Sequence, residues 1–353
     1  MKNKTSFLTD IKQNLPSGLV VFLVALPLCL GIALASGAPP LSGIIAGIIG
    51  GLVIGFLSNS HISVSGPAAG LAAIVLVGIS DLGSFELFLV AGIIAGIIQL
   101  ILGFVRAGSI SNYFPNNVIE GMLAGIGVII ILKQIPHAVG YDKDFEGNQR
   151  IFDGFNLTEY VTNLSNAISP GAIVITLVSL GILLTWEKIP ALKKIKMLPG
   201  ALVAVAVGIL LNEVFKGSSL EIAKEHLVTL PVPESAEDFK NLITFPDFTG
   251  FMNPKVWILG ATIAIVASIE TLLCIEASDR MDAHKRITDT NLELKAQGIG
   301  NLISAMIGGL PMTSVVVRSS ANANAGATSK TSTIIHGIFM LICVLTIPFL
   351  LNK

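Results

Sequence analysis

The segment 308–327, GGLPMTSVVVRSSANANAGA, places a Gly-Gly-Leu-Pro break and an arginine between two long apolar stretches. Its position predicts that it lies at membrane depth. Broken backbone and charge are stable at that depth only where they line a cavity or are buried in protein. A second break, 63–70 (SVSGPAAG), occupies a similar place in the first half of the chain. Paired short segments interrupted by Gly and Pro are the strongest sequence indication of a transporter's binding site.

The apolar content of the chain defines its class. Of its 353 residues, 52% are hydrophobic and 13% charged, with a mean hydropathy of +0.79, which is typical of a polytopic protein of the lipid bilayer. The three cysteines fall inside apolar runs and the five histidines show no ligand spacing, so we predict no metal and no cofactor. We find no nucleophile–base arrangement and no basic-aromatic face, so we predict neither an enzyme nor nucleic-acid binding.

Hydropathy predicts an all-α protein with about eleven spans. The third span is shortened and the tenth is interrupted. Alternating these spans from a cytoplasmic N-terminal tail, residues 1–16, places most basic residues of the short loops in the cytoplasm, as the positive-inside rule requires. We therefore expect a cell inner (plasma) membrane protein with a cytoplasmic N-terminus. The predicted spans are 17–36, 41–57, 66–80, 85–105, 117–133, 170–186, 198–214, 256–277, 294–307, the interrupted tenth and 332–351.

Glu270 lies in the middle of the predicted eighth span, in IAIVASIETLLCIEA. An ionised carboxylate at that depth costs about 3 kcal/mol on insertion scales, so it must face a polar cavity, pair with a cation or be protonated. The functional interpretation is a proton or coupling-ion site, and the structural one is a carboxylate buried between helices. Glu120, near the end of the fifth span, is interpreted as interfacial.

Arg318 follows the second break. Its guanidinium fork suits an oxyanion and could instead pair with Glu270. The alternative is a side chain that snorkels to the membrane interface. The residues after both breaks, Ala68–Ala69 and Val317–Arg318, are predicted to expose free backbone N–H groups at the N-termini of half-helices. Two such termini would form an anion site from partial positive charges.

Five segments of the chain resemble the sulfate permease (SulP) family over essentially its whole length. The resemblance implies an inverted-repeat fold of seven plus seven spans, in which spans 1–4 and 8–11 form a core that moves against a gate. It also implies a homodimer and a small inorganic anion bound between half-helices three and ten. Substrate contacts then fall to Ala68, Ala69, Val317 and Arg318, and coupling to Glu270. The segments are VALPLCLGIALASGAPP, HISVSGPAAGLAAIV, SIETLL, QGIGNLISAMIGGLP and VVVRSSANANAGA.

The same resemblance divides the chain into regions. Core spans would occupy 17–105 and 254–353, gate spans 106–216, and an extracytoplasmic loop 217–253. Family members continue with three more spans and usually a STAS domain, whereas this sequence stops at Lys353. We therefore expect a truncated chain.

The prediction of the coupling ion and of the substrate depends on one difference between this chain and the family. Sodium-coupled bicarbonate members place hydroxyl groups around the span-eight carboxylate, where this chain has Ala69, Cys274 and Val316, poor ligands for a hard cation. This difference favours proton-coupled symport of sulfate through Glu270. Sodium-coupled or exchange transport of bicarbonate, an uncoupled anion channel and a non-transporting, anion-binding fragment stay open. A membrane enzyme with Glu270 as acid or base is disfavoured.

Overall fold

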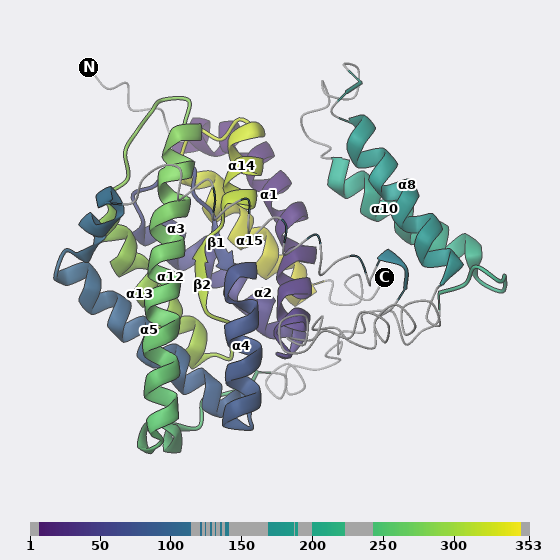
Figure 1. Cartoon of the computed structure of the whole chain (residues 1–353). Helices are drawn as coiled ribbons and strands as arrows, with labels where there is room; N and C mark the ends of the chain where they lie inside the picture. The colour runs from purple at the N-terminus through teal and green to yellow at the C-terminus, as the bar shows by residue number, and fades with distance from the viewer. Residues whose placement is uncertain are drawn as a thin grey trace. The chain divides into compact units, whose positions relative to one another are not determined.

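The chain divides into two compact units, which we describe separately using a computed structural model (Figure 1). One unit comprises Met1–Ile119 and Pro231–Phe349, and the other Glu120–Leu230 and Leu350–Lys353. The predicted fifth span, with Glu120, falls outside the described residues except at isolated positions, as do the loop 141–168 and most of the loop 217–253. The structure describes residues 7–113, 121, 124, 128, 131, 135, 138–140, 169–186, 188–189, 200–222 and 243–346.

Helices dominate the described part of the first unit. A π-helical segment, Gly50–Ile54, joins α2 to α3, and short 3-10 segments occupy Ala107–Tyr113 and Phe248–Met252. Four continuous helical stretches among the described residues are long and apolar enough to cross a membrane: Leu8–Ala35, Pro40–Leu57, Phe85–Phe104 and Pro254–Met281. The helices are α1 (Phe7–Ala35), α2 (Pro40–Ile49), α3 (Gly55–Leu57), α4 (Ala69–Leu82), α5 (Phe85–Phe104), α12 (Pro254–Met281), α13 (Thr290–Met306), α14 (Val316–Asn324) and α15 (Thr331–Thr346).

Helix α1 begins well before the predicted first span. Residues 7–16, expected to belong to a tail, form its first turns. The Asp10 carboxylate accepts hydrogen bonds from the Ser329 and Thr331 hydroxyls, and the Asn14 side-chain oxygen accepts from the Thr328 amide at 2.8 Å. Helix α1 therefore extends on the N-terminal side of its apolar stretch, where it makes polar contacts with the segment that leads into α15. Hydropathy alone does not detect such contacts.

The two sequence breaks meet as a pair of short antiparallel strands at the centre of the first unit (Figure 1). Strand β1 (Ser65–Pro67) pairs with β2 (Met312–Ser314), with Ser65 opposite Ser314 and Pro67 opposite Met312. A residue that precedes proline favours extended backbone, which applies to Gly66 in β1 and to Leu310 just before β2. Unpaired backbone groups are costly at membrane depth, so each break supplies hydrogen-bond partners for the other.

The packing around this crossing joins the two halves of the sequence. Helix α5 packs along α13, where the backbones approach closely at Gly96 and Gly298. Helix α1 packs against α15, and α12 against α5 and α4. Fully buried side chains such as Phe88, Ile94 and Ile263 form the apolar interior.

In the second unit, α8 (Pro170–Trp186) packs against α10 (Gly200–Phe215). These helices correspond to the predicted sixth and seventh spans.

Candidate functional site

Two half-helices begin where the strands end. Helix α4 begins at Ala69, later than the predicted start of the third span at residue 66, because Gly66 and Pro67 belong to β1. Helix α14 begins at Val316, one residue before the predicted N-terminus at Val317. Neither N-cap side chain accepts a hydrogen bond from the first turn. The first-turn N–H groups therefore make no bond to an N-cap side chain, and the positive end of a helix dipole lies at each of these turns. Ala69 and Val317 are exposed, the latter by 60%.

The Glu270 side chain on α12 lies against the first turn of α4. A Cβ atom on Gly70 would stand 2.9 Å from its Oε1 and 3.0 Å from its Oε2. Glu270 is half-buried, and among the described residues it has neither a hydrogen-bond partner nor an ion pair. The structure thus brings together the predicted coupling residue and the predicted N-terminus of the third half-helix.

Arg318 is fully buried, which excludes the snorkelling alternative in this conformation. Its guanidinium lies against Gly66 of β1, where a Cβ atom would clash with Nη1, and Nη2 donates to the Pro67 carbonyl at 3.5 Å. Its Nε and Nη1 have no partner among the described residues. It pairs neither with Glu270 nor with any other carboxylate among the described residues, and it lies beside the strand that leads into α4.

Side chains of α14 connect its first turns to the first break. Ser319 accepts a hydrogen bond from the Val64 amide at 3.0 Å and donates to Val315, whose own amide donates to the Val64 carbonyl. Asn322, one turn later, donates to the Ile62 carbonyl at 2.8 Å. These bonds join α14 to the backbone just before β1, the strand that leads into α4.

A polar stripe on α13, which the sequence reasoning missed, holds the strand pair from the other side. Gln297 donates to the Ser65 hydroxyl at 2.7 Å. Asn301 accepts from the Met312 amide at 2.6 Å and donates to the Met312 carbonyl at 3.1 Å, and Ser304 donates to Leu310. The signal was present in the sequence, because polar residues spaced by three or four in an otherwise apolar helix share one face.

The three positions that depart from the hydroxyl pattern lie on the elements that form the site. Ala69 opens α4, Val316 opens α14, and the Val316 backbone amide reaches the Cys274 sulfur on α12. A thiol and two aliphatic side chains offer no hard oxygen ligand near Glu270.

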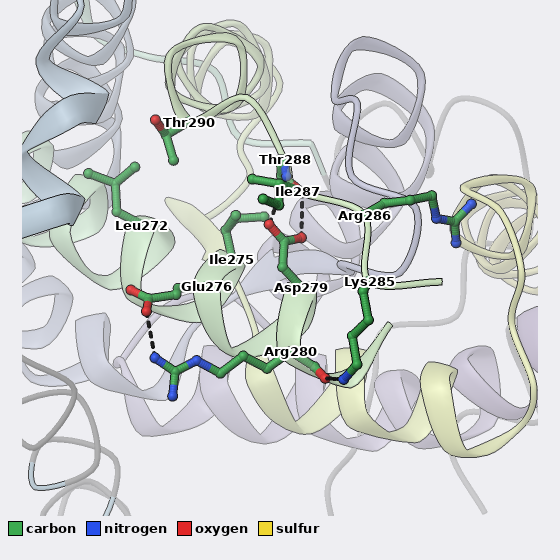
Figure 2. Close-up of a pocket in the computed structure, with 10 residues that line it drawn as sticks. All are labelled: Leu272, Ile275, Glu276, Asp279, Arg280, Lys285, Arg286, Ile287, Thr288 and Thr290. Atoms are coloured by element: carbon green, nitrogen blue, oxygen red, sulfur yellow. Dashed lines mark hydrogen bonds and ion pairs between the residues drawn. The ribbon is translucent and has the colours of Figure 1, made fainter. Parts of the chain in front are cut away.

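A separate hollow of about 430 Å³ lies at the end of α12, where α12 turns into α13 (Figure 2). Its basic side chains already have partners: Arg280 donates to Glu276 at 2.6 Å, and Lys285 donates to the Arg280 carbonyl at 2.6 Å. Asp279 accepts two hydrogen bonds from Thr288 in the same view. We interpret these bonds as holding the loop between α12 and α13 in place.

These features define a helical membrane protein in which two half-helices follow one antiparallel strand pair, near a buried arginine and a carboxylate in the middle of α12. The chain belongs to the sulfate permease family, whose family model matches residues 11–353. The predicted membership is confirmed. YvdB of Bacillus subtilis (strain 168), whose name proposes sulfate transport, is 30% identical over 345 residues, 96% of this chain and 60% of that protein. Bicarbonate transporter BicA of Picosynechococcus sp. is 24% identical over 97% of this chain and 58% of its own length.

Solved structures support the same fold. The transmembrane domain of a cyanobacterial bicarbonate transporter BicA matches with a TM-score of 0.76 at 22% identity, covering 99% of this chain and 86% of that chain. The structure of SLC26A9 matches with a TM-score of 0.72 at 17% identity, covering 99% and 56%. The predicted helical membrane fold is therefore confirmed, and the family and its structural neighbours are transporters rather than enzymes. The chain spans about 60% of the length of the relatives it matches.

Proposed function

We propose that this chain carries a small inorganic anion across the membrane, with sulfate as the substrate and a proton as the coupled ion. The carrying observation is the pair of uncapped N-termini, α4 after Ala68 and α14 after Val315, that begin at one strand crossing. Helix N-termini bind oxyanions through free N–H groups and contribute roughly half a positive charge each. Ala68, Ala69 and Val317 are the proposed backbone contacts.

Arg318 supplies the remaining positive charge. Its buried guanidinium at the end of β1 adds one full charge to the two half-charges, so roughly two positive charges face a sulfate dianion. Because the guanidinium is removed from water, its attraction to the anion is screened less than that of a surface arginine.

Glu270 is the proposed coupling residue. In the ionised form it would place a negative charge against the first turn of α4, where the anion binds, and would repel it. Protonation removes that repulsion, so anion and proton bind together. The Cys274 sulfur and the aliphatic side chains of Ala69 and Val316 favour a proton over sodium at this position.

Alternating access would then come from movement of a core domain against a gate. In this proposal the core comprises 17–105 and 254–353 and the gate 106–216, with 217–253 outside the cell. We further propose a homodimer in the inner (plasma) membrane, with a cytoplasmic N-terminus and a fold built on the seven-plus-seven repeat.

The test is flux of radiolabelled sulfate and bicarbonate into proteoliposomes under imposed proton or sodium gradients. Proton-driven, saturable sulfate uptake is the expected result. Bicarbonate is the second candidate because the chain resembles proteins named as bicarbonate transporters, and sodium-driven bicarbonate uptake would select it. Passive, non-saturating flux would indicate a channel, and anion binding without flux a non-transporting fragment. Proton-driven uptake unchanged in Glu270→Gln would refute the coupling role.

A further inference from the structure

Glu293, in the first turn of α13, is a buried carboxyl group with no role in the anion cycle proposed above. Its side chain is fully buried. One carboxyl oxygen bonds the Ser58 hydroxyl, and the other accepts a hydrogen bond from Gln297 Nε2 at 2.9 Å. Since Ser58 is the C-cap of α3, this carboxyl joins the end of the second span to the beginning of α13.

The charges around Glu293 do not neutralise it. Lys330, from the loop between α14 and α15, lines the same narrow polar crevice, but its Nζ donates to the carbonyls of Phe56 and Ser58 at 2.8 and 3.0 Å. Within the described part of the chain no cation forms an ion pair with Glu293. Asp279, from α12, acts on it with a further negative charge.

Two effects compete over the state of this carboxyl. The N-terminus of α13 favours the ionised form, because the positive end of the helix dipole lies in the first turn. Complete burial without a paired cation disfavours the ionised form, and this penalty is the larger of the two. A neutral carboxylic acid satisfies both of its oxygens here, since its O–H can donate to the Ser58 hydroxyl while its carbonyl oxygen accepts from Gln297.

We propose that Glu293 holds a proton in the folded protein and is a second proton-binding site of this chain, apart from Glu270. The amide of Gln297 donates both to Glu293 and to the Ser65 hydroxyl in β1. A change in the charge of Glu293 therefore acts on the strand that leads into α4. Loss of the proton makes the bond from Gln297 to the carboxylate charge-assisted and therefore stronger. This draws the Gln297 amide towards Glu293 and weakens its bond to Ser65 in β1.

The effect on transport rests on the proposed function, whereas the protonation of Glu293 does not. The direct test is infrared difference spectroscopy of the full chain in lipid bilayers, titrated with acid and base. Performed in a Glu270→Gln background, it isolates the band of the second protonated carboxylic acid. We expect this band at neutral pH, its loss in Glu293→Gln, and its persistence in Glu276→Gln, which alters a half-buried acid paired with Arg280.

A band that survives Glu293→Gln overturns the proposal. Should that variant fail to fold, Ser58→Ala tests the same assignment. Removing the hydroxyl partner of Glu293 must shift its band to higher frequency. An unshifted band contradicts the assignment. Sulfate affinity measured against pH is the second readout. It is measured in the Glu270→Gln background, which removes the alkaline loss expected from Glu270 itself. There it falls in the alkaline range and stays level once Glu293→Gln is added. An equal loss of sulfate affinity at alkaline pH with and without Glu293→Gln would refute the link to β1. If the Glu293 band is present but the chain binds no sulfate, only the proposed function is refuted.

Discussion

The Glu270 carboxylate lies directly against Gly70, with Oε1 2.9 Å and Oε2 3.0 Å from the position that a Cβ atom on Gly70 would occupy. The two residues come from opposite halves of the sequence, one in the middle of α12 and the other in the first turn of α4. This contact places a titratable group beside a helix N-terminus, and the proposed proton coupling depends on that placement.

Substitution of Gly70 by alanine should move the Glu270 carboxylate. A methyl group there overpacks the contact at a cost of about 1–3 kcal/mol, so we expect sulfate uptake to fall about tenfold or more. Proteoliposome uptake measures the effect. Gly31→Ala on α1 is the matched control, because a Cβ atom there meets nothing within 4 Å. Equal uptake by the two variants would contradict the prediction.

Arg318→Ala should weaken sulfate binding by about tenfold or more, which corresponds to about 1.4 kcal/mol. The physical reason is the loss of a buried charge beside the α4 N-terminus. Isothermal titration of the purified chain measures the affinity, and Arg318→Lys should recover part of it because the charge returns without the fork. Arg280→Ala, which removes an exposed arginine paired with Glu276, serves as the control. Unchanged affinity in Arg318→Ala would exclude a role in binding.

Asn301→Leu should destabilise the fold through the strand crossing. Pro67, opposite Met312, has no N–H group to donate, and Asn301 bonds both the amide and the carbonyl of Met312. An apolar side chain leaves these buried groups without that partner, at about 1–3 kcal/mol for each. We expect a lower midpoint of thermal unfolding, and a smaller change in Asn324→Leu, whose side chain is exposed on α14. Equal midpoints would indicate that β2 does not depend on α13.

The pair Asp282–Arg286 gives a pH dependence outside the membrane. Arg286 donates two side-chain hydrogen bonds to the carboxylate, at 2.6 and 2.9 Å, and holds the pKa of Asp282 well below its usual range. The stabilisation is therefore complete above the unfolded-state pKa of about 3.9 and is lost as the pH falls towards the folded-state value.

Thermal unfolding measured between pH 3 and pH 7 tests this pair (the range brackets the ordinary carboxyl pKa of about 4). Asp282→Asn should be less stable than the unmodified chain at neutral pH, and the difference should narrow in the acidic range. A difference that widens on acidification would have the wrong sign for a carboxylate with a lowered pKa.

Asn14→Ala should loosen the contact between α1 and the segment before α15. Its side-chain oxygen accepts from the Thr328 and Ser329 amides, at 2.8 and 3.2 Å, and its side chain is fully buried. Loss of these bonds should cost about 1–3 kcal/mol of stability. Lys12→Ala, an exposed residue two positions earlier, should have little effect. Equal stability of both variants would indicate that the contacts of Asn14 do not attach residues 7–16 to the rest of the fold.

Hydropathy predicted the long helices because a lipid-facing helix must be apolar along its whole length. It also predicted the two breaks, since Gly-Pro sequences and Arg318 cannot face lipid. It did not predict that α1 begins at Phe7, because the bonds of Asp10 and Asn14 are made to residues more than three hundred positions away. Span count, repeat symmetry and coupling ion stay predictions.

The sequence by itself determined a helical membrane protein of the sulfate permease family with two breaks at membrane depth. It also identified Glu270 and Arg318 as candidate site residues near those breaks. Only the tertiary structure decided what each candidate touches. Arg318 lies in the interior beside β1 rather than at the interface, and Glu270 lies against Gly70 rather than against Arg318. Periodicity fixes the face of a helix on which a side chain lies, whereas its neighbour across the fold depends on how the two halves of the chain cross.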